Sequence, residues 1–147
     1  MKCLFTLFLA ASVIYATAQD IPPVLYIGYS SAIYKEGATT GNYYPCNVKI
    51  SITWEGKEAH QVILTENNIT ETITITKLVS RFTNYYSRNN GLDTFRVFYD
   101  IYEGRSGRTK SMCRIKWGIF DYPVDGQCAS IKIDYENDGR VFRLKRD

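Results

Sequence analysis

The chain has 147 residues, a formal net charge of +3, 45% hydrophobic residues and a single histidine. A charge this close to balance does not favour a nucleic-acid partner. The cysteine spacing fits no zinc-binding pattern, so we expect neither a metal nor a cofactor.

The first residues form a leader. Lys2 is followed by an apolar run over Cys3–Val13, and Ala16–Ala18 is a small-residue cleavage signal. We therefore expect a signal peptide over residues 1–18 and one secreted, extracellular domain over residues 19–147. Loss of Lys2 lowers the net charge from +3 to +2. The apolar run is too short for a membrane span with these flanks, and no later run is long enough, so we expect no transmembrane segment.

Alternating apolar and polar residues predict strands along the rest of the chain. The turn residues at 55–56 and 67–68 and the loops expected at 35–42, 83–91 and 104–110 separate these strands. In the first two thirds of the chain the predicted strands are Val24–Tyr29, Cys46–Glu55, Gln61–Thr65, Glu71–Val79 and Thr94–Tyr102.

The segment Met112–Leu144 contains three further alternating stretches, with turn residues at 122–126 and 137–139. No segment has a sustained helical period. About eight short strands with frequent turns are typical of a β-sandwich or a barrel. We predict an all-β fold, an antiparallel β-sandwich of about eight strands.

Several of these stretches resemble the PLAT (lipoxygenase-homology) family, and within it the C-terminal β-sandwich domain of pancreatic-type lipases. The similar stretches are VKISITWEG at 48–56, LDTFRV at 92–97, RIKW at 114–117 and CASIKIDYENDGRVFRL at 128–144. The three cysteines that remain after the leader are not those of the family. The resemblance implies a sandwich that docks partners and assists at lipid surfaces.

Catalytic patterns are weak. The segment Gly28–Ala32 is a near miss to a nucleophile elbow, but no helix pattern follows Ser30, and His60 would be the only available base. Acidic residues alternate at 134–138, but the hairpin turn there already explains them. We predict that the protein is not an enzyme and holds no metal.

The cysteines allow a topological prediction. Cys46 opens the second predicted strand and Cys113 the sixth, so both lie at one end, and both have the parity of inward-facing residues. We therefore predict a Cys46–Cys113 disulfide. Cys128 opens the seventh strand at the other end and faces outward. It is predicted to be a free thiol or the link of a Cys128-bridged dimer.

Three surface features suggest binding. Asn68 begins a glycosylation sequon. Arg105, Arg108 and Lys110 belong to a basic stretch that, with a second one near the C-terminus, either forms a cationic face for anionic lipid or glycan or is simply solvated. The pairs Tyr43–Tyr44 and Tyr85–Tyr86 fall in predicted loops. They suit either a membrane or protein interface or a loop folded over the end of the core.

These features predict a secreted, non-enzymatic binding module. Its expected partner is an anionic lipid surface, a lipid-associated molecule or a protein. The alternative is a secreted effector or toxin-like protein that acts on a receptor.

Overall fold

The computed structural model describes residues 24–35 and 42–147. These residues form eight strands and one short 3-10 turn, η1 (Asn89–Gly91), which joins the fourth strand to the fifth. The strands are β1 (Val24–Lys35), β2 (Tyr44–Glu55), β3 (Glu58–Glu66), β4 (Ile69–Arg88), β5 (Asp93–Ser106), β6 (Met112–Val124), β7 (Gln127–Asp134) and β8 (Asp138–Arg146).

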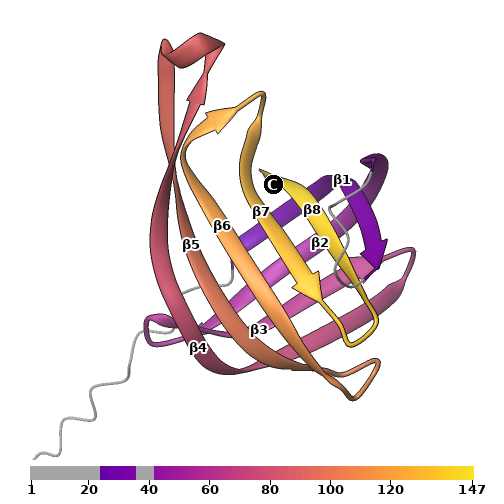
Figure 1. Cartoon of the computed structure of the whole chain (residues 1–147). Coiled ribbons are helices and arrows are strands. Elements are labelled where there is room, and N and C mark those ends of the chain that lie inside the picture. The colour runs from indigo at the N-terminus through magenta and orange to yellow at the C-terminus, as the bar shows by residue number, and fades with distance from the viewer. Residues whose placement is uncertain (1–23, 36–41) are drawn as a thin grey trace, which may run out of the picture.

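The sheet closes into an antiparallel barrel (Figure 1). Each strand pairs with its neighbour in the chain, and β1 also pairs with β8, for example Ser31 with Phe142. The all-β prediction is confirmed, but the predicted sandwich is corrected to a closed barrel. The pairing of β1 with β8 distinguishes the two folds. In a sandwich the strands form two separate sheets with free edges, whereas here this pairing joins the two edge strands and closes one sheet.

The alternation in the sequence explains what fills the barrel. Within the barrel, alternate residues of the strands point inward, and these residues form one continuous core. At its centre the Tyr26 and Trp117 rings meet edge to face, with centroids 5.0 Å apart. On β2 the predicted inward residues Val48, Ile50 and Ile52 are buried, whereas Ile119, predicted to point inward on β6, is exposed. The middle of the barrel is therefore packed with side chains.

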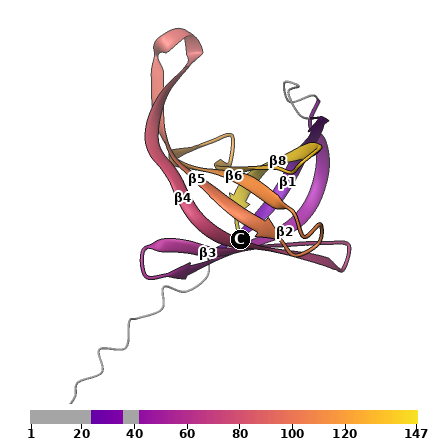
Figure 2. The ribbon, with the colours of Figure 1, turned by 60° about the horizontal axis from the view of Figure 1, so that its bottom comes forward.

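The largest departure from the predicted elements is the upper part of β4. Residues 83–88 of the expected loop continue as strand and pair with β5 up to Arg88 and Asp93. The two strands extend beyond the barrel as a long hairpin (Figures 1 and 2). The expected basic loop is also shorter, because β5 runs to Ser106. The expected loop at 35–42 lies almost wholly outside the described residues.

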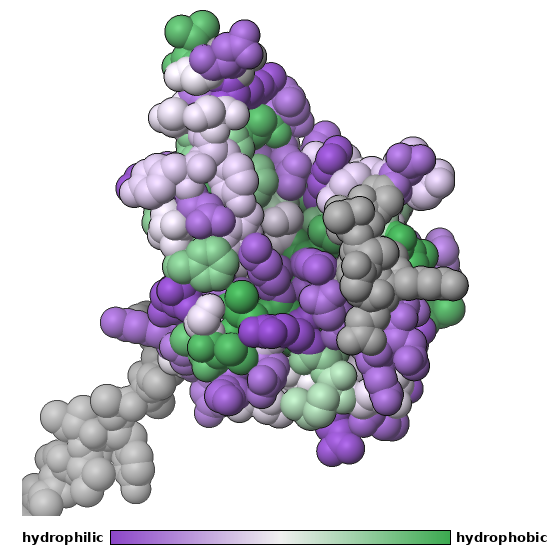
Figure 3. Space-filling view, viewed as in Figure 1, coloured by the Kyte–Doolittle hydropathy of each residue, from purple (hydrophilic) through white to green (hydrophobic). Residues whose placement is uncertain are grey.

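Aromatic side chains stabilise this hairpin. The Phe95 ring stacks between those of Tyr86 and Phe120, with centroids 5.5 and 5.6 Å away. The Phe82 ring lies 5.2 Å from that of Tyr99. In Figure 3, side chains of intermediate hydropathy, drawn in pale colours, cover much of the upper part of β4 and β5, with some hydrophobic green ones among them. We call Phe82, Tyr86, Phe95, Tyr99 and Phe120 the aromatic patch; composition alone suggested a loop here, but cross-strand ring contacts favour a strand.

The three cysteines of the described chain are free thiols, so the predicted Cys46–Cys113 bridge is not formed. Both residues do lie at the same end of the barrel. However, β2 and β6 are four strands apart in either direction around the closed sheet, which places them on opposite walls. An eight-strand barrel is roughly 16 Å across, whereas a disulfide needs Cα atoms within about 7 Å. Cys128 is half-buried against the core and donates to the Leu144 carbonyl at 3.6 Å.

Across residues 24–35 and 42–147, no helix has the length and apolar character needed to span a bilayer.

Candidate functional site

One end of the barrel, which we call the mouth, is where β1, β3, β5 and β7 end and the other four strands begin. Here the inward-facing row of several strands changes from apolar to polar. On β3, Leu64 is followed by Glu66, and on β8, Phe142 is preceded by Arg140. Because these residues share one end and one face, their side chains meet above the core.

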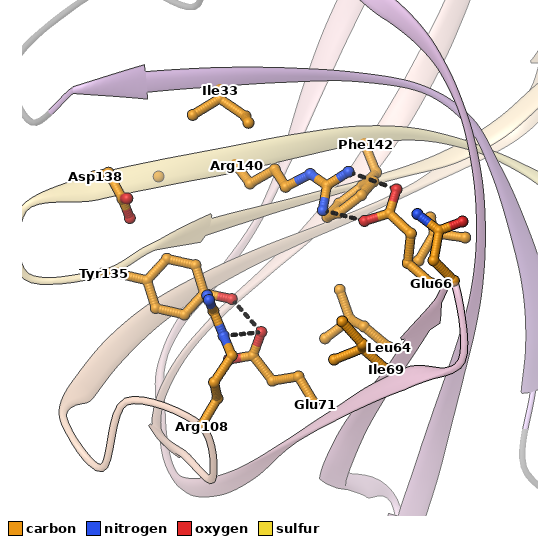
Figure 4. Close-up of a pocket in the computed structure, with 13 residues that line it drawn as sticks. Ile33, Leu64, Glu66, Ile69, Glu71, Arg108, Tyr135, Asp138, Arg140 and Phe142 are labelled. Atoms are coloured by element: carbon orange, nitrogen blue, oxygen red, sulfur yellow. Dashed lines mark hydrogen bonds and ion pairs between the residues drawn. The ribbon is translucent and has the colours of Figure 1, made fainter.

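The mouth contains a cavity of about 340 Å³, the mouth pocket (Figure 4). Five apolar residues and seven residues with polar or charged side chains line it. They come from β1, β2, β3, β4, the β3–β4 and β5–β6 turns, the segment after β7, and β8. The apolar lining is Ile33, Val48, Leu64, Ile69 and Phe142, and the polar lining is Glu66, Asn67, Glu71, Arg108, Tyr135, Asp138 and Arg140.

Arg140 and Glu66 form a two-pronged ion pair across the pocket. Arg140 donates from Nη1 to Glu66 Oε2 at 2.6 Å and from Nη2 to Oε1 at 2.8 Å. Nη2 also lies 3.3 Å from Ser31 Oγ, and the guanidinium sits 4.4 Å above the Phe142 ring. The hydrogen bonds from Arg140 lower the pKa of Glu66, so this carboxyl stays ionised at neutral pH.

Glu71, on the neighbouring strand β4, is the centre of a second network. Its side chain is only 11% exposed, and it accepts hydrogen bonds from Ser106 Oγ at 2.6 Å and from the Tyr135 hydroxyl at 2.9 Å. Arg108 Nε lies 3.5 Å from the same carboxylate. Burial and the neighbouring Glu71 carboxylate raise the pKa of Tyr135, so its hydroxyl remains a donor.

Two arginine side chains of the mouth have hydrogen-bonding capacity that the contacts within the chain do not fully use. Arg140 Nε is buried and has no hydrogen-bond partner among the described residues. Arg108 has a side chain 58% exposed, and its Nε lies 3.5 Å from Glu71, which is a long contact for an ion pair. A buried donor without a partner is costly, so an acceptor at this position would be stabilising. The mouth can therefore offer N–H donors beside an apolar wall.

Of the first basic stretch, Arg105, Arg108 and Lys110, only Arg108 lines the pocket, and of the second stretch Arg140 does. Arg105 Nε donates to the Lys110 carbonyl at 3.0 Å, a contact within the β5–β6 turn. Lys110 is exposed and has a positive φ of 63°. In the second basic stretch, Arg143 lies 3.8 Å above the Tyr43 ring and Lys145 lies 4.6 Å above the Tyr29 ring. Several of these cations therefore contact aromatic rings on the barrel's outside.

The predicted aromatic pairs lie at opposite ends of the barrel. Tyr43 precedes β2 at the mouth, where it packs on Ala32 outside the barrel, and Tyr44 is exposed. Tyr85 and Tyr86 lie on the hairpin, beyond the other end. All but Tyr43 belong to strands, so they do not form one set of loops.

The weak catalytic pattern is not assembled. Ser30 lies on β1, and its Oγ is buried without a partner. His60 lies at the start of β3, away from the mouth, with Glu55 at 3.4 Å. Within the described ranges, no three His, Cys, Asp or Glu side chains come together as a metal site would require. Asn68 is exposed in the β3–β4 turn, beside Asn67 of the pocket lining.

Sequence reasoning missed Glu66, Glu71 and Tyr135 as site residues, and it recognised Arg140 only as a member of the second basic stretch. A signal for them was present, because each continues the inward parity of its strand by one step beyond the apolar residues. What the sequence does not contain is which strand ends meet, and that depends on the closure of the barrel.

A small antiparallel barrel with a packed interior and a polar mouth is the class that this fold and site define. No family model, no curated protein and no solved structure matches the chain. The resemblance to PLAT domains therefore stays a prediction.

Proposed function

We propose that the protein is a secreted, non-enzymatic binding protein that holds a small amphipathic molecule in the mouth of its barrel. The observation that carries this proposal is the meeting of an apolar wall and seven hydrogen-bonding side chains in one cavity of about 340 Å³. A concave, partly apolar site with a few converging polar groups is the usual form of a small-molecule site. The interior of an eight-strand barrel is either filled by side chains or holds one small ligand. Here the middle is filled and the cavity lies at the mouth.

The polar side of the ligand carries a hydrogen-bond acceptor. Three carboxylates line the pocket. Two are already engaged by donors, Glu66 by Arg140 and Glu71 by Ser106 and Tyr135, and the third, Asp138, is exposed. The unused capacity lies instead on the guanidinium groups. An anionic or strongly accepting group on the ligand would therefore find donors without leaving a buried charge unpaired.

The placement of the surface residues favours a ligand inside the mouth over a flat lipid surface. Tyr43 and Tyr44 lie at the mouth, whereas Tyr85 and Tyr86 lie beyond the opposite end. One membrane plane would therefore not engage both aromatic pairs together with the basic β5–β6 turn.

Titration with anilinonaphthalene sulfonate (ANS), an apolar anionic dye, tests the proposal. We expect saturable binding of one dye per chain. The double substitution Ile33→Asp and Ile69→Asp places charge on the exposed rim of the pocket and should weaken binding at least about tenfold, or about 1.4 kcal/mol. Both residues are highly exposed, at 70% and 68%, so the fold should tolerate the change.

The control is Leu92→Asp, which changes an exposed apolar residue at the tip of the hairpin. This variant should bind the dye like the unmodified protein. If Leu92→Asp weakens binding and the rim substitutions do not, the dye binds the hairpin and the proposal is overturned. Native mass spectrometry of the secreted protein would then identify any small molecule that it retains.

A further inference from the structure

The upper part of β4 has a free edge. β3 pairs with β4 only from Ile69 to Thr74, whereas β5 pairs with β4 as far as Arg88. Within residues 24–35 and 42–147, no strand pairs with the other edge of β4 beyond Thr74. Figures 1 and 2 show this segment standing clear of the barrel. Its outward backbone N–H and C=O groups are therefore available to another strand.

The edge is protected unevenly. Two register shifts occur between Ile75 and Ser80, and such bulges discourage pairing. From Arg81 to Arg88 the pairing with β5 is regular; we call this segment the β4 edge. Its two arginines are held within the chain, because Arg81 binds Asp100 at 2.6 and 2.9 Å and Arg88 binds Asp125 at 2.9 Å. Neither charge therefore remains unpaired to repel an approaching strand.

We propose that the β4 edge pairs with the β4 edge of a second copy of this chain. The two strands run antiparallel about a two-fold axis at Asn84, which forms one sheet across both hairpins. In this arrangement Phe82 faces Tyr86 of the second copy, and Tyr86 faces Phe82. The aromatic patch then continues from one copy into the other.

The residue pattern of the edge selects this register. A two-fold axis at Asn84 places Arg81 opposite Ser87 and Arg88 opposite Ser80, so no like charges meet. An axis at Thr83 would place Phe82 opposite Asn84, and an axis at Tyr85 would place it opposite Arg88. The Asn84 register places two aromatic pairs opposite each other, Phe82 with Tyr86 and Tyr86 with Phe82, whereas an axis at Tyr85 places only Tyr85 opposite itself. Facing aromatic residues are a favourable cross-strand combination. The residues from Thr83 to Arg88 are all exposed and so accessible to a second copy.

Sedimentation velocity of residues 19–147 in reductant tests this proposal. Protein concentrations from about 1 μM to about 1 mM detect weak to moderate association. We expect a concentration-dependent dimer. Asn84→Lys places two lysines directly opposite each other on the axis, so it should raise the dimer dissociation constant at least about tenfold. An equimolar mixture of Asn84→Lys and Asn84→Glu should restore the dimer, because unlike charges then face each other. Reductant removes any contribution from a Cys128 bridge.

Thr94→Lys is the matched control. Thr94 is exposed on the same hairpin but belongs to β5 and pairs with Ser87, so it lies off the β4 edge. This variant should associate like the unmodified protein. A protein that stays monomeric throughout the range overturns the proposal, as does association that Asn84→Lys leaves unchanged.

Discussion

Arg108 has an exposed guanidinium at the mouth and is the residue at which a charged ligand is most directly tested. Changing Arg108 to Gln should weaken ANS binding several-fold, because a charged hydrogen bond is worth about 1.5 to 3 kcal/mol before competition from water and Glu71. Added salt should reduce this difference between the two proteins, since the site is partly open to solvent.

Arg105→Gln provides the control for charge alone. This residue lies three positions away and contacts the β5–β6 turn and not the pocket. An equal loss of dye binding in both variants would mean that general positive charge attracts the dye, and that Arg108 has no specific part.

The Glu66–Arg140 pair should make stability depend on pH. The pKa of Glu66 is lowered in the folded protein, so its ion pair contributes fully above the unfolded value of about 4.3 and is lost as the pH falls through the folded pKa. Urea unfolding at neutral pH should show Glu66→Gln less stable by about 1 to 2 kcal/mol. This difference in unfolding free energy between the two proteins should disappear at acid pH. The exposed Glu136 of the neighbouring turn is the control, and Glu136→Gln should show no such difference.

The thiols should differ in reactivity. Burial raises the pKa of Cys113 to about 11, so almost none of it is thiolate at about pH 8. Iodoacetamide should label Cys113 in the native protein far more slowly than in urea. Peptide mapping without reductant should find Cys46, Cys113 and Cys128 all labelled after unfolding. A peptide linking Cys46 to Cys113 would contradict the barrel.

At the scale of the elements, Gly28 determines how closely β1 approaches β2 and β8. A Cβ at this position would collide with Cγ1 of Val48 and would lie 3.5 Å from both Leu144 and Phe142. Gly28→Ala should therefore destabilise the protein by about 1 to 3 kcal/mol through overpacking. Denaturant unfolding measures this loss. Ser51→Ala on the neighbouring strand β2, at a half-exposed position outside the core cluster, should change stability by less than about 0.5 kcal/mol.

For the whole molecule, alternation located the strands but could not choose between a sandwich and a barrel. Ile131 and Ile133 face inward in either fold, because a strand of a sandwich and a strand of a barrel each have one buried face. The hairpin was missed for a different reason. Thr83–Gly91 has the composition of a loop, and its ring contacts with β5 and β6 become visible only when the three strands lie side by side.

The mouth could be predicted only in part. Arg108 stood out because it lies in a run of cations. Glu66 and Arg140 are far apart in the sequence, and each resembles an ordinary surface charge at a strand end. Their contact depends on closure, which no local pattern encodes.

Closure also determines how the chain can fold. Seven of the eight strand pairings join neighbours in sequence, and only β1–β8 joins opposite ends of the chain. Local hairpins form quickly, whereas a contact across the whole chain has the largest loop-closure cost. We expect β1–β8 to pair last, and pulse-labelling hydrogen exchange during refolding should show Tyr26 and Leu144 protected after Ile63 and Ile73. During synthesis the first strand must therefore wait, unpaired on one edge, until the last strand has left the ribosome.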